Sequence, residues 1–439
     1  MTSAPASVAG EKNKGQGWMW SVLPLNAGVQ GFSTMVPLYI LFLGGNVVQV
    51  ALFTTLYNAV LIPSSIFWGR LTDRWARRRV FFVITCLGTT VFFAAMFLLP
   101  NLDDLAALYG GLGFVVSANA VAANLLVMET SEKKNWISSY SNLSLVSNLG
   151  SIIGVAVGFV WASALPLGAF LIFCAAATAA SVVLSYALIS EPVLPLEAEH
   201  APLNPARVLH GVTSFVHHFV VSRGMAKDAL RVLRATRAGA ITGRVLLFFS
   251  TFLFTTSSAF LNTSFSPFLV DSAVTDNEVF AISLVNIIIQ TMAYRWMGSF
   301  IKRLGGVRIG PNSVLLRTFL YMVFAGAALV SRGTLLFLIA SVVYAATGVA
   351  YALWNSSTSV TLLSNLGPGR QGNLLGGYAA LGALGTVAGS LFTGYISYYD
   401  GYSTTFTVAA AIMLGSFFVL EAALKALGYT QRQAPTESR

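Results

Sequence analysis

The sequence predicts an all-α integral membrane protein with twelve transmembrane helices in two pseudo-symmetric six-helix bundles. Three observations lead to this fold class. The chain is 56% hydrophobic and only 10% charged, whereas a soluble domain carries about 25% charged residues. The apolar residues gather in runs of roughly 20, the length that crosses the hydrocarbon core of a bilayer. One long polar interruption separates six of these runs from the other six.

Each apolar run is expected to be a helix, because backbone groups in lipid need hydrogen-bond partners within their own segment. A transmembrane β-barrel would show short alternating segments instead. The predicted spans are residues 18–43, 47–70, 79–99, 104–129, 138–162, 167–190, 242–269, 278–302, 313–331, 334–362, 374–398 and 402–427. The predicted domains are therefore an N-terminal tail (1–17), a six-helix bundle (18–190), a linker (191–241), a second six-helix bundle (242–427) and a C-terminal tail (428–439).

The positive charges indicate which side of the membrane holds the termini. Twelve spans place both termini on one side, and cytoplasmic termini put 25 of the 26 lysines and arginines inside, leaving only Arg332 outside. The net charge of +10 thus reflects topology and attraction to an anionic inner leaflet, and we expect no nucleic-acid partner. The expected location is the cell membrane.

The linker is interpreted as one or two amphipathic helices on the inner membrane face. His210, His217 and His218 lie in it, but no nearby Cys, Asp or Glu completes a set of metal ligands. The spans contain no Ser-His-Asp set and no phosphate-binding loop, so neither an enzyme, a metal site nor a cofactor is expected. Cys86 and Cys174 fall inside apolar spans and predict no disulfide.

The turn between the second and third spans carries five arginines and one aspartate in the eleven residues Gly69 to Arg79. It resembles the loop between spans two and three of transporters of the major facilitator superfamily, although Ala76 stands where that pattern has its second glycine. The residues that match the pattern in register are Gly69, Leu71, Asp73, Arg74, Arg77 and Arg78.

The two halves of the chain also resemble each other. The shift from Gly69 to Gly298 is 229 residues, and Pro37 to Pro267 is a shift of 230. The resemblance to the superfamily implies two halves related by an axis along the membrane normal, which rock around a central site, and a monomer.

Polar residues within the spans are the candidate solute contacts, because each costs free energy in hydrocarbon unless it has a partner or faces water. Spans 3, 6, 9 and 12 hold no Asn or Gln, and the superfamily resemblance places these spans outside the central cavity. The predicted solute-binding residues are Gln30, Asn58, Asn119, Asn148, Thr255, Thr256, Gln290, Trp354 and Asn355. Hydrogen bonding between helices is the alternative role for each of them.

Charge is expected to be missing from the middle of the membrane. Glu129 and Arg317 are predicted toward cytoplasmic ends of their spans, so a neutral or amphipathic solute is favoured. A proton or a counter-solute is left open as a coupling partner, with Glu129 and Asp73 as the candidate titrating groups.

The basic turn is predicted to act as a cytoplasmic latch, as the resemblance implies, with ion pairs that form when the inner side is closed. Topology alone is the alternative role for its arginines. The predicted latch residues are Gly69, Asp73, Arg74, Arg77, Glu129 and Arg303.

Glycines four residues apart recur in two spans and predict close helix packing. They are Gly150, Gly154 and Gly158 in span 5, and Gly385 and Gly389 in span 11.

These features predict secondary active or facilitative transport of a small solute by alternating access, with efflux of drug-like or metabolite compounds as the leading use. Uptake of a sugar-like or other polar nutrient is the alternative within this class. A non-transporting sensor or a lipid mover on the same scaffold is the alternative outside it.

Overall fold

The computed structural model describes residues 14–74, 77–131, 136–189, 243–304, 309–330, 332–364 and 371–428. These residues form twelve long α-helices, with a short 3-10 helix η1 (Lys14–Ser21) before the first and a second, η3 (Leu167–Ala169), before the sixth. The long helices are α2 (Val22–Phe42), α3 (Val47–Arg74), α4 (Arg78–Leu98), α5 (Leu102–Thr130), α6 (Trp136–Ala164), α7 (Phe170–Leu188), α10 (Gly243–Asp271), α11 (Asp276–Leu304), α12 (Ile309–Val330), α13 (Gly333–Ser364), α14 (Gln371–Tyr399) and α15 (Gly401–Ala426).

The predicted all-α membrane class is confirmed. Ten helical segments among the described residues are long and apolar enough to cross a membrane, and α2 and α5 complete the set of twelve long helices. Most predicted edges agree with the helices within a few residues. The starts differ most for the first and the ninth spans, since α2 begins at Val22, directly after η1, rather than at residue 18, and α12 begins at Ile309 rather than at residue 313.

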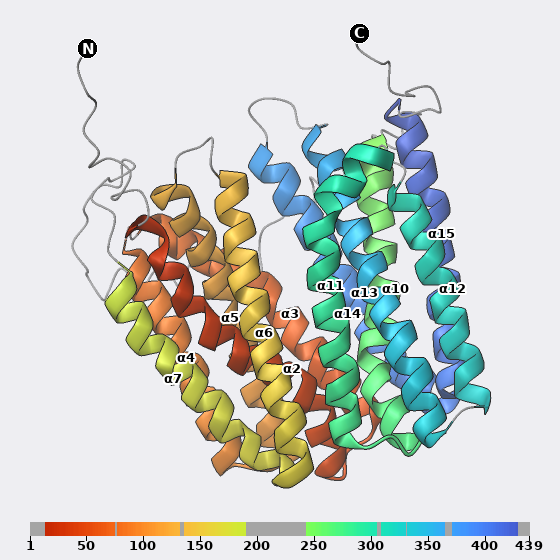
Figure 1. Ribbon diagram of the computed structural model, residues 1–439, viewed down its shortest axis with the longest axis horizontal. Helices are drawn as coiled ribbons and strands as arrows, with labels where there is room; N and C mark the ends of the chain where they lie inside the picture. Colours follow the sequence, from red (N-terminus) through yellow and green to blue (C-terminus); the bar gives the residue numbers. More distant parts are fainter. Residues whose placement is uncertain are drawn as a thin grey trace, which may run out of the picture.

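The helices pack as two bundles of six with matching internal contacts (Figure 1). In the first, here called the N-bundle (α2–α7), α2 packs on α6 and α7, α3 on α5, and α4 on α5 and α7. In the second, the C-bundle (α10–α15), α10 packs on α14 and α15, α11 on α13, and α12 on α13 and α15. Each contact of one bundle has its counterpart six spans later in the other, so the pseudo-symmetry detected in the sequence extends to the packing.

The glycine repeats let two pairs of helices approach to backbone contact. A Cβ placed on Gly154 of α6 would lie 2.0 Å from the carbonyl oxygen of Ala27 in α2. In the other bundle, a Cβ on Gly389 of α14 would lie 2.3 Å from the carbonyl oxygen of Thr256 in α10. The predicted role of these glycines in close helix packing is therefore confirmed.

The two bundles meet through α3 with α14 and through α6 with α11. We call the side of the molecule at which α2 begins the proximal side and the opposite side the distal side. Thr55 of α3 and Ser390 of α14 form a hydrogen bond of 2.9 Å between their hydroxyl oxygens, and both lie in the distal halves of their helices. A Cβ on Gly158 of α6 would lie 2.3 Å from the ring of Phe280 in α11, so this second contact is also distal.

The ribbons converge at the distal end, at the bottom of Figure 1, and separate toward the proximal end at the top. The contacts just described close the distal side.

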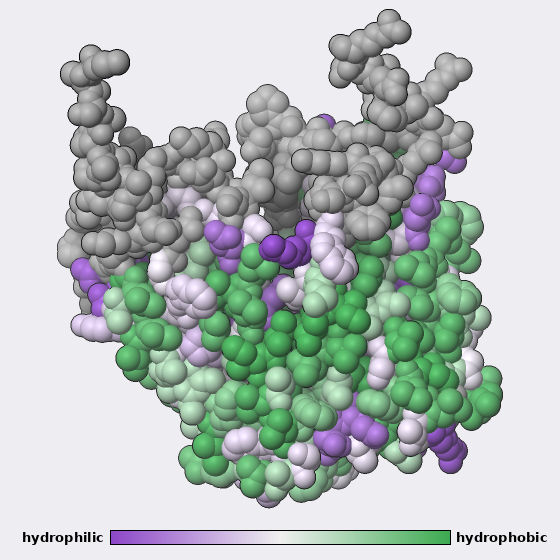
Figure 2. Space-filling view, viewed as in Figure 1, coloured by the Kyte–Doolittle hydropathy of each residue, from purple (hydrophilic) through white to green (hydrophobic). Residues whose placement is uncertain are grey.

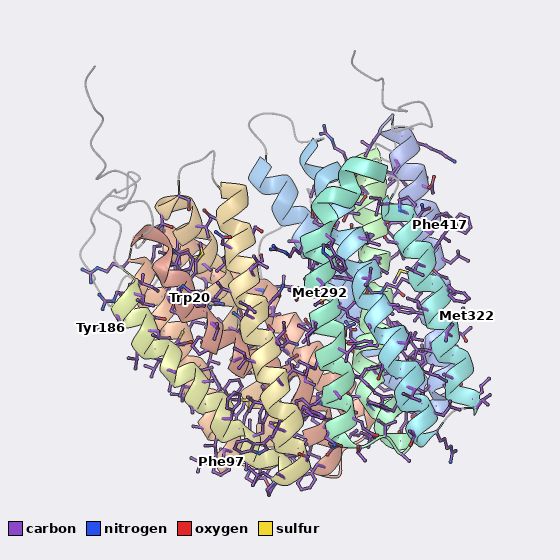
Figure 3. The ribbon with its side chains drawn as sticks, viewed as in Figure 1. Trp20, Phe97, Tyr186, Met292, Met322 and Phe417 are labelled. Atoms are coloured by element: carbon purple, nitrogen blue, oxygen red, sulfur yellow. The ribbon has the colours of Figure 1, made fainter. Side chains whose placement is uncertain are left out.

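Apolar side chains cover the middle of the outer surface, and hydrophilic ones gather toward the upper and lower edges of the view (Figure 2). The labelled side chains of Phe97, Tyr186 and Met322 lie at the periphery of the molecule in Figure 3, and each is at least 42% exposed. Large apolar groups exposed in a band of this kind are what a lipid-facing surface requires.

Candidate functional site

A cavity of about 360 Å³ lies between the two bundles, midway along their helices. The helices that line most of the cavity are α2 and α6 of the N-bundle and α10, α11 and α13 of the C-bundle. One further lining residue comes from α12. The lining residues are Gln30, Ser33, Thr34, Pro37, Asn148, Ser151, Ser258, Asn262, Phe265, Ser266, Ser283, Asn286, Ile287, Gln290, Arg317, Tyr344, Thr347, Gly348 and Tyr351.

The lining is built from one face of each helix. On α2 the lining positions are Gln30 and the residues three, four and seven positions after it. The same spacing recurs on α11 from Ser283 and on α13 from Tyr344. Residues at this spacing share one side of an α-helix. Each of the three helices therefore directs one face into the cavity, and the faces of α2 and α11 are mostly polar.

Three of the predicted solute-binding residues are brought together in this cavity. Gln30 comes from α2, Asn148 from α6 and Gln290 from α11. The two bundles thus both contribute amide side chains, which can donate and accept hydrogen bonds with a solute.

The other predicted solute-binding residues lie outside the cavity lining. The Asn58 amide donates to the carbonyl of Thr54 within its own helix, at 2.8 Å. The hydroxyls of Thr255 and Thr256 donate to carbonyls in α10, and both residues lie against the glycines of α14. In the described structure Thr255 and Thr256 pack against α14, and neither they nor Asn58 line the cavity.

Asn119, Trp354 and Asn355 have surroundings of a different kind. Within the described part of the chain, the Oδ1 atom of Asn119 and the Nε1 atom of Trp354 are buried without a hydrogen-bond partner. The Trp354 ring stacks on Phe254 with 3.5 Å between ring centroids. The Asn355 amide donates to the hydroxyl of Tyr294 at 3.3 Å. Trp354 is therefore part of an aromatic stack inside the C-bundle.

The expectation that no charged side chain lies near the centre of the spans is wrong for Arg317. Its helix, α12, begins four residues before the predicted start, which places Arg317 about 12 Å along the helix axis instead of about 6 Å. The side chain is 4% exposed and lines the cavity. Because Arg317 belongs to the ninth span and lines the cavity, the expectation that this span lies outside the cavity is also wrong.

The sequence contains a signal for several cavity-lining residues that are not in the predicted solute-binding set. Ser258, Asn262 and Ser266 of α10 lie four positions apart, and Asn286 lies four positions before Gln290 on α11. A search for polar residues at helical spacing, rather than for single residues near span centres, would have found these stripes.

The predicted latch lies mostly beyond what the structure describes. The side chains of Asp73, Arg74, Glu129 and Arg303 and the whole linker, with His210, His217 and His218, are outside the described residues. A Cβ placed on Gly69 would meet no atom of the described residues within 4 Å, and Arg77 is exposed at the start of α4. The latch therefore stays a prediction.

Two neighbouring arginines do more than set topology. Arg78 donates a hydrogen bond to the carbonyl of Thr72 at the end of α3. Arg79 lies over the ring of Tyr186 in α7, at 3.8 Å from its centroid, and donates to the carbonyl of the same residue.

Comparisons with known proteins agree with this architecture. The sequence model described as Major Facilitator Superfamily matches residues 19–376. No match was found among curated protein sequences.

Three solved structures illustrate the structural likeness. A mutant form of the nucleoside transporter NupG has a TM-score of 0.73 at 14% identity, over 94% of this chain and 99% of that one. A POT family transporter in complex with 5-aminolevulinic acid has a TM-score of 0.76 at 10% identity, over 93% and 96%. The human organic anion transporter MFSD10 has a TM-score of 0.60 at 17% identity, over 95% and 100%.

Proposed function

The chain belongs to the Major Facilitator Superfamily of membrane transporters, and we propose that it moves a small amphipathic organic solute through the cavity between its bundles by alternating access. The observation that carries this proposal is the cavity itself, which is enclosed by polar stripes from both bundles. Its volume of about 360 Å³ falls in the range of about 300–1,000 Å³ that small-molecule sites occupy.

The lining favours a solute with several polar groups. Gln30 and Asn148 reach the cavity from one bundle and Asn286 and Gln290 from the other, so a solute bound here would bridge the two halves. Phe265, Tyr344 and Tyr351 add apolar ring surface. This mixture of amides, hydroxyls and rings suits an amphipathic molecule better than a lipid tail, which would need a continuous apolar path.

Alternating access is supported by where the bundles touch. The distal contacts of Thr55 with Ser390 and of Gly158 with Phe280 separate the cavity from the distal side. A rocking motion that breaks these contacts and brings the proximal ends together would present the same cavity to the other side. We place the proximal side of the molecule on the cytoplasmic side of a cell membrane, because the basic residues gather at the proximal ends of the helices.

The test is solute flux into proteoliposomes that contain the full chain. A panel of labelled neutral sugars, amphipathic dyes and small metabolites is offered from either side, with and without a pH gradient. We expect at least one amphipathic solute to cross only when the protein is present. The side from which it crosses distinguishes export from uptake, and its response to the gradient distinguishes proton coupling from exchange.

The variants Gln30→Ala and Gln290→Ala are expected to lower this flux by about tenfold each, because a lost hydrogen bond to the solute is worth roughly 1.4 kcal/mol. Thr407→Ala is the matched control, since Thr407 is an exposed residue of α15 whose hydroxyl donates to the carbonyl of Ser403 in its own helix. Solute-induced thermal stabilisation without any flux would contradict the proposal and favour a sensor. Flux of labelled lipid alone would favour a lipid mover.

A further inference from the structure

Arg317 is the charged side chain of the cavity lining and enters it from α12. Met322 of the same helix is 50% exposed and projects away from the bundle (Figure 3). The helix therefore has one face toward lipid and directs its cationic side chain inward, against the neighbouring helices α10 and α13.

The surroundings of Arg317 hold the guanidinium in place without neutralising it. Its Nε atom donates to the hydroxyl of Tyr321 at 2.8 Å. The guanidinium carbon lies 5.0 Å from the ring centroid of Phe254 and 5.5 Å from those of Tyr321 and Tyr351. Aromatic faces attract a cation, and the rings fix its orientation by packing around it.

One end of the guanidinium remains unsatisfied. The Nη1 atom is buried and has no hydrogen-bond partner among the residues that the structure describes. Among the described residues, no carboxylate forms an ion pair with Arg317. A buried charge without a counter-charge is costly, and such a charge inside a membrane protein marks a ligand or ion pathway.

The acidic residues that the structure describes in the C-bundle lie away from this position. Asp271, Asp276, Glu278 and Asp400 lie at the distal ends of their helices, and Glu421 lies in the last turns of α15. Among the residues that the structure describes, no carboxylate therefore reaches Arg317, and the cavity leaves room for a partner that enters from outside.

We propose that Arg317 binds the carboxylate of a small organic monoanion, and that the transported solute belongs to this class. A guanidinium presents a planar pair of N–H donors that matches the two oxygens of a carboxylate. One cation in the lining calls for one negative charge on the solute. The remainder of the solute lies against the rings of Tyr344 and Tyr351 and reaches the amides of Gln290 and Gln30. This proposal rests on the transport function proposed above and specifies the charge of its solute.

The test compares carboxylates with the matching neutral amides as ligands of the purified full-length protein. The probes are benzoate with benzamide, lactate with lactamide, and sodium chloride as the inorganic anion. Binding is measured by the shift in melting temperature and by calorimetric titration. We expect at least one carboxylate to bind roughly tenfold or more tightly than its amide, and chloride to bind more weakly than that carboxylate.

Variants assign the effect to Arg317. Arg317→Gln is expected to remove the preference for the carboxylate, whereas Arg317→Lys keeps the charge and should retain part of it. Arg295→Gln is the matched control, because it removes an exposed positive charge from α11 and should leave the preference intact. If Arg317→Gln fails to fold, the comparison of carboxylate with amide in the unaltered protein still decides the question.

Equal binding of carboxylates and amides by the unaltered protein, or an unchanged preference in Arg317→Gln, would overturn the proposal. Chloride binding as tight as that of the carboxylates would also overturn it, by assigning the guanidinium to an inorganic ion. These results are distinct from failure of the transport proposal, since flux of a neutral solute that Arg317→Gln leaves unchanged would uphold transport and reject only the anionic solute.

Discussion

The double variant Thr55→Cys/Ser390→Cys is expected to lose transport on oxidation and to regain it on reduction. The hydroxyl oxygens of the two native residues are 2.9 Å apart and join α3 of the N-bundle to α14 of the C-bundle. The sulfurs of two cysteines would take positions near those of the two oxygens, and a movement of about 1 Å brings them to the disulfide bond length of about 2.05 Å.

The expected loss of flux is roughly tenfold or more, because a covalent lock on the distal side prevents the conformational step that transport requires. The measurement is proteoliposome flux before oxidation, after oxidation and after treatment with dithiothreitol, with thiol labelling to quantify the crosslink. The native Cys86 and Cys174 are buried and free, so they interfere little with the readout.

A matched control exists within one bundle. Ser397 of α14 and Thr405 of α15 also have hydroxyl oxygens 2.9 Å apart, but both belong to the C-bundle. Ser397→Cys/Thr405→Cys is expected to crosslink without loss of flux. Full transport by a Thr55–Ser390 crosslinked protein would show that the distal contact does not open, and alternating access through this cavity would have to be abandoned.

The variant Gly154→Val is expected to destabilise the folded protein by about 3 kcal/mol, at the upper end of what overpacking of a core typically costs. A Cβ at this position would lie 2.0 Å from the carbonyl oxygen of Ala27 and 2.9 Å from its Cα atom. These are backbone atoms of α2, so no side-chain rotation relieves the clash. The helices α2 and α6 must separate, and both contribute to the cavity lining.

Thermal melting of the detergent-solubilised protein and the yield of monodisperse material measure this effect. Gly326→Val is the control, because Gly326 of α12 has no atom within 4 Å of its would-be Cβ, while the cost of a β-branched residue in a helix is shared by both variants. A melting temperature of Gly154→Val equal to that of Gly326→Val would show that the approach of α2 and α6 is looser than described.

The glycine stripes take on two roles that their spacing does not distinguish. Gly150 and Gly154 admit the backbone of α2 within one bundle, whereas Gly158, four residues further on, meets Phe280 of the other bundle. On α14, Gly389 lies against α10 of its own bundle, whereas Gly394 lies against Ala51 of α3 in the other. A glycine can pack against a helix of its own bundle or form a distal contact with the other bundle. Which of the two it does depends on where the neighbouring helices end.

The sequence by itself determined the class of protein, the order of its helices and their division into two related halves. Hydrophobicity is a property of each residue and adds up along the chain, so runs of apolar residues predict spans without knowledge of their neighbours. The repeat of Gly69 in Gly298 and of Pro37 in Pro267 likewise depends only on the chain. The candidate site was predicted in part, since Gln30, Asn148 and Gln290 do line the cavity.

Only the tertiary structure decided which side chains face that cavity. Direction depends on the rotation of each helix about its axis and on the helices packed against it, which is why Asn58 bonds within its own helix while Gln30 reaches the cavity. For Arg317 a shift of four residues in the start of one helix moved a charge from the membrane surface to the cavity wall. Burial without a counter-charge then arises from the packing of Phe254, Tyr321 and Tyr351 around the guanidinium, which no pattern along the chain contains.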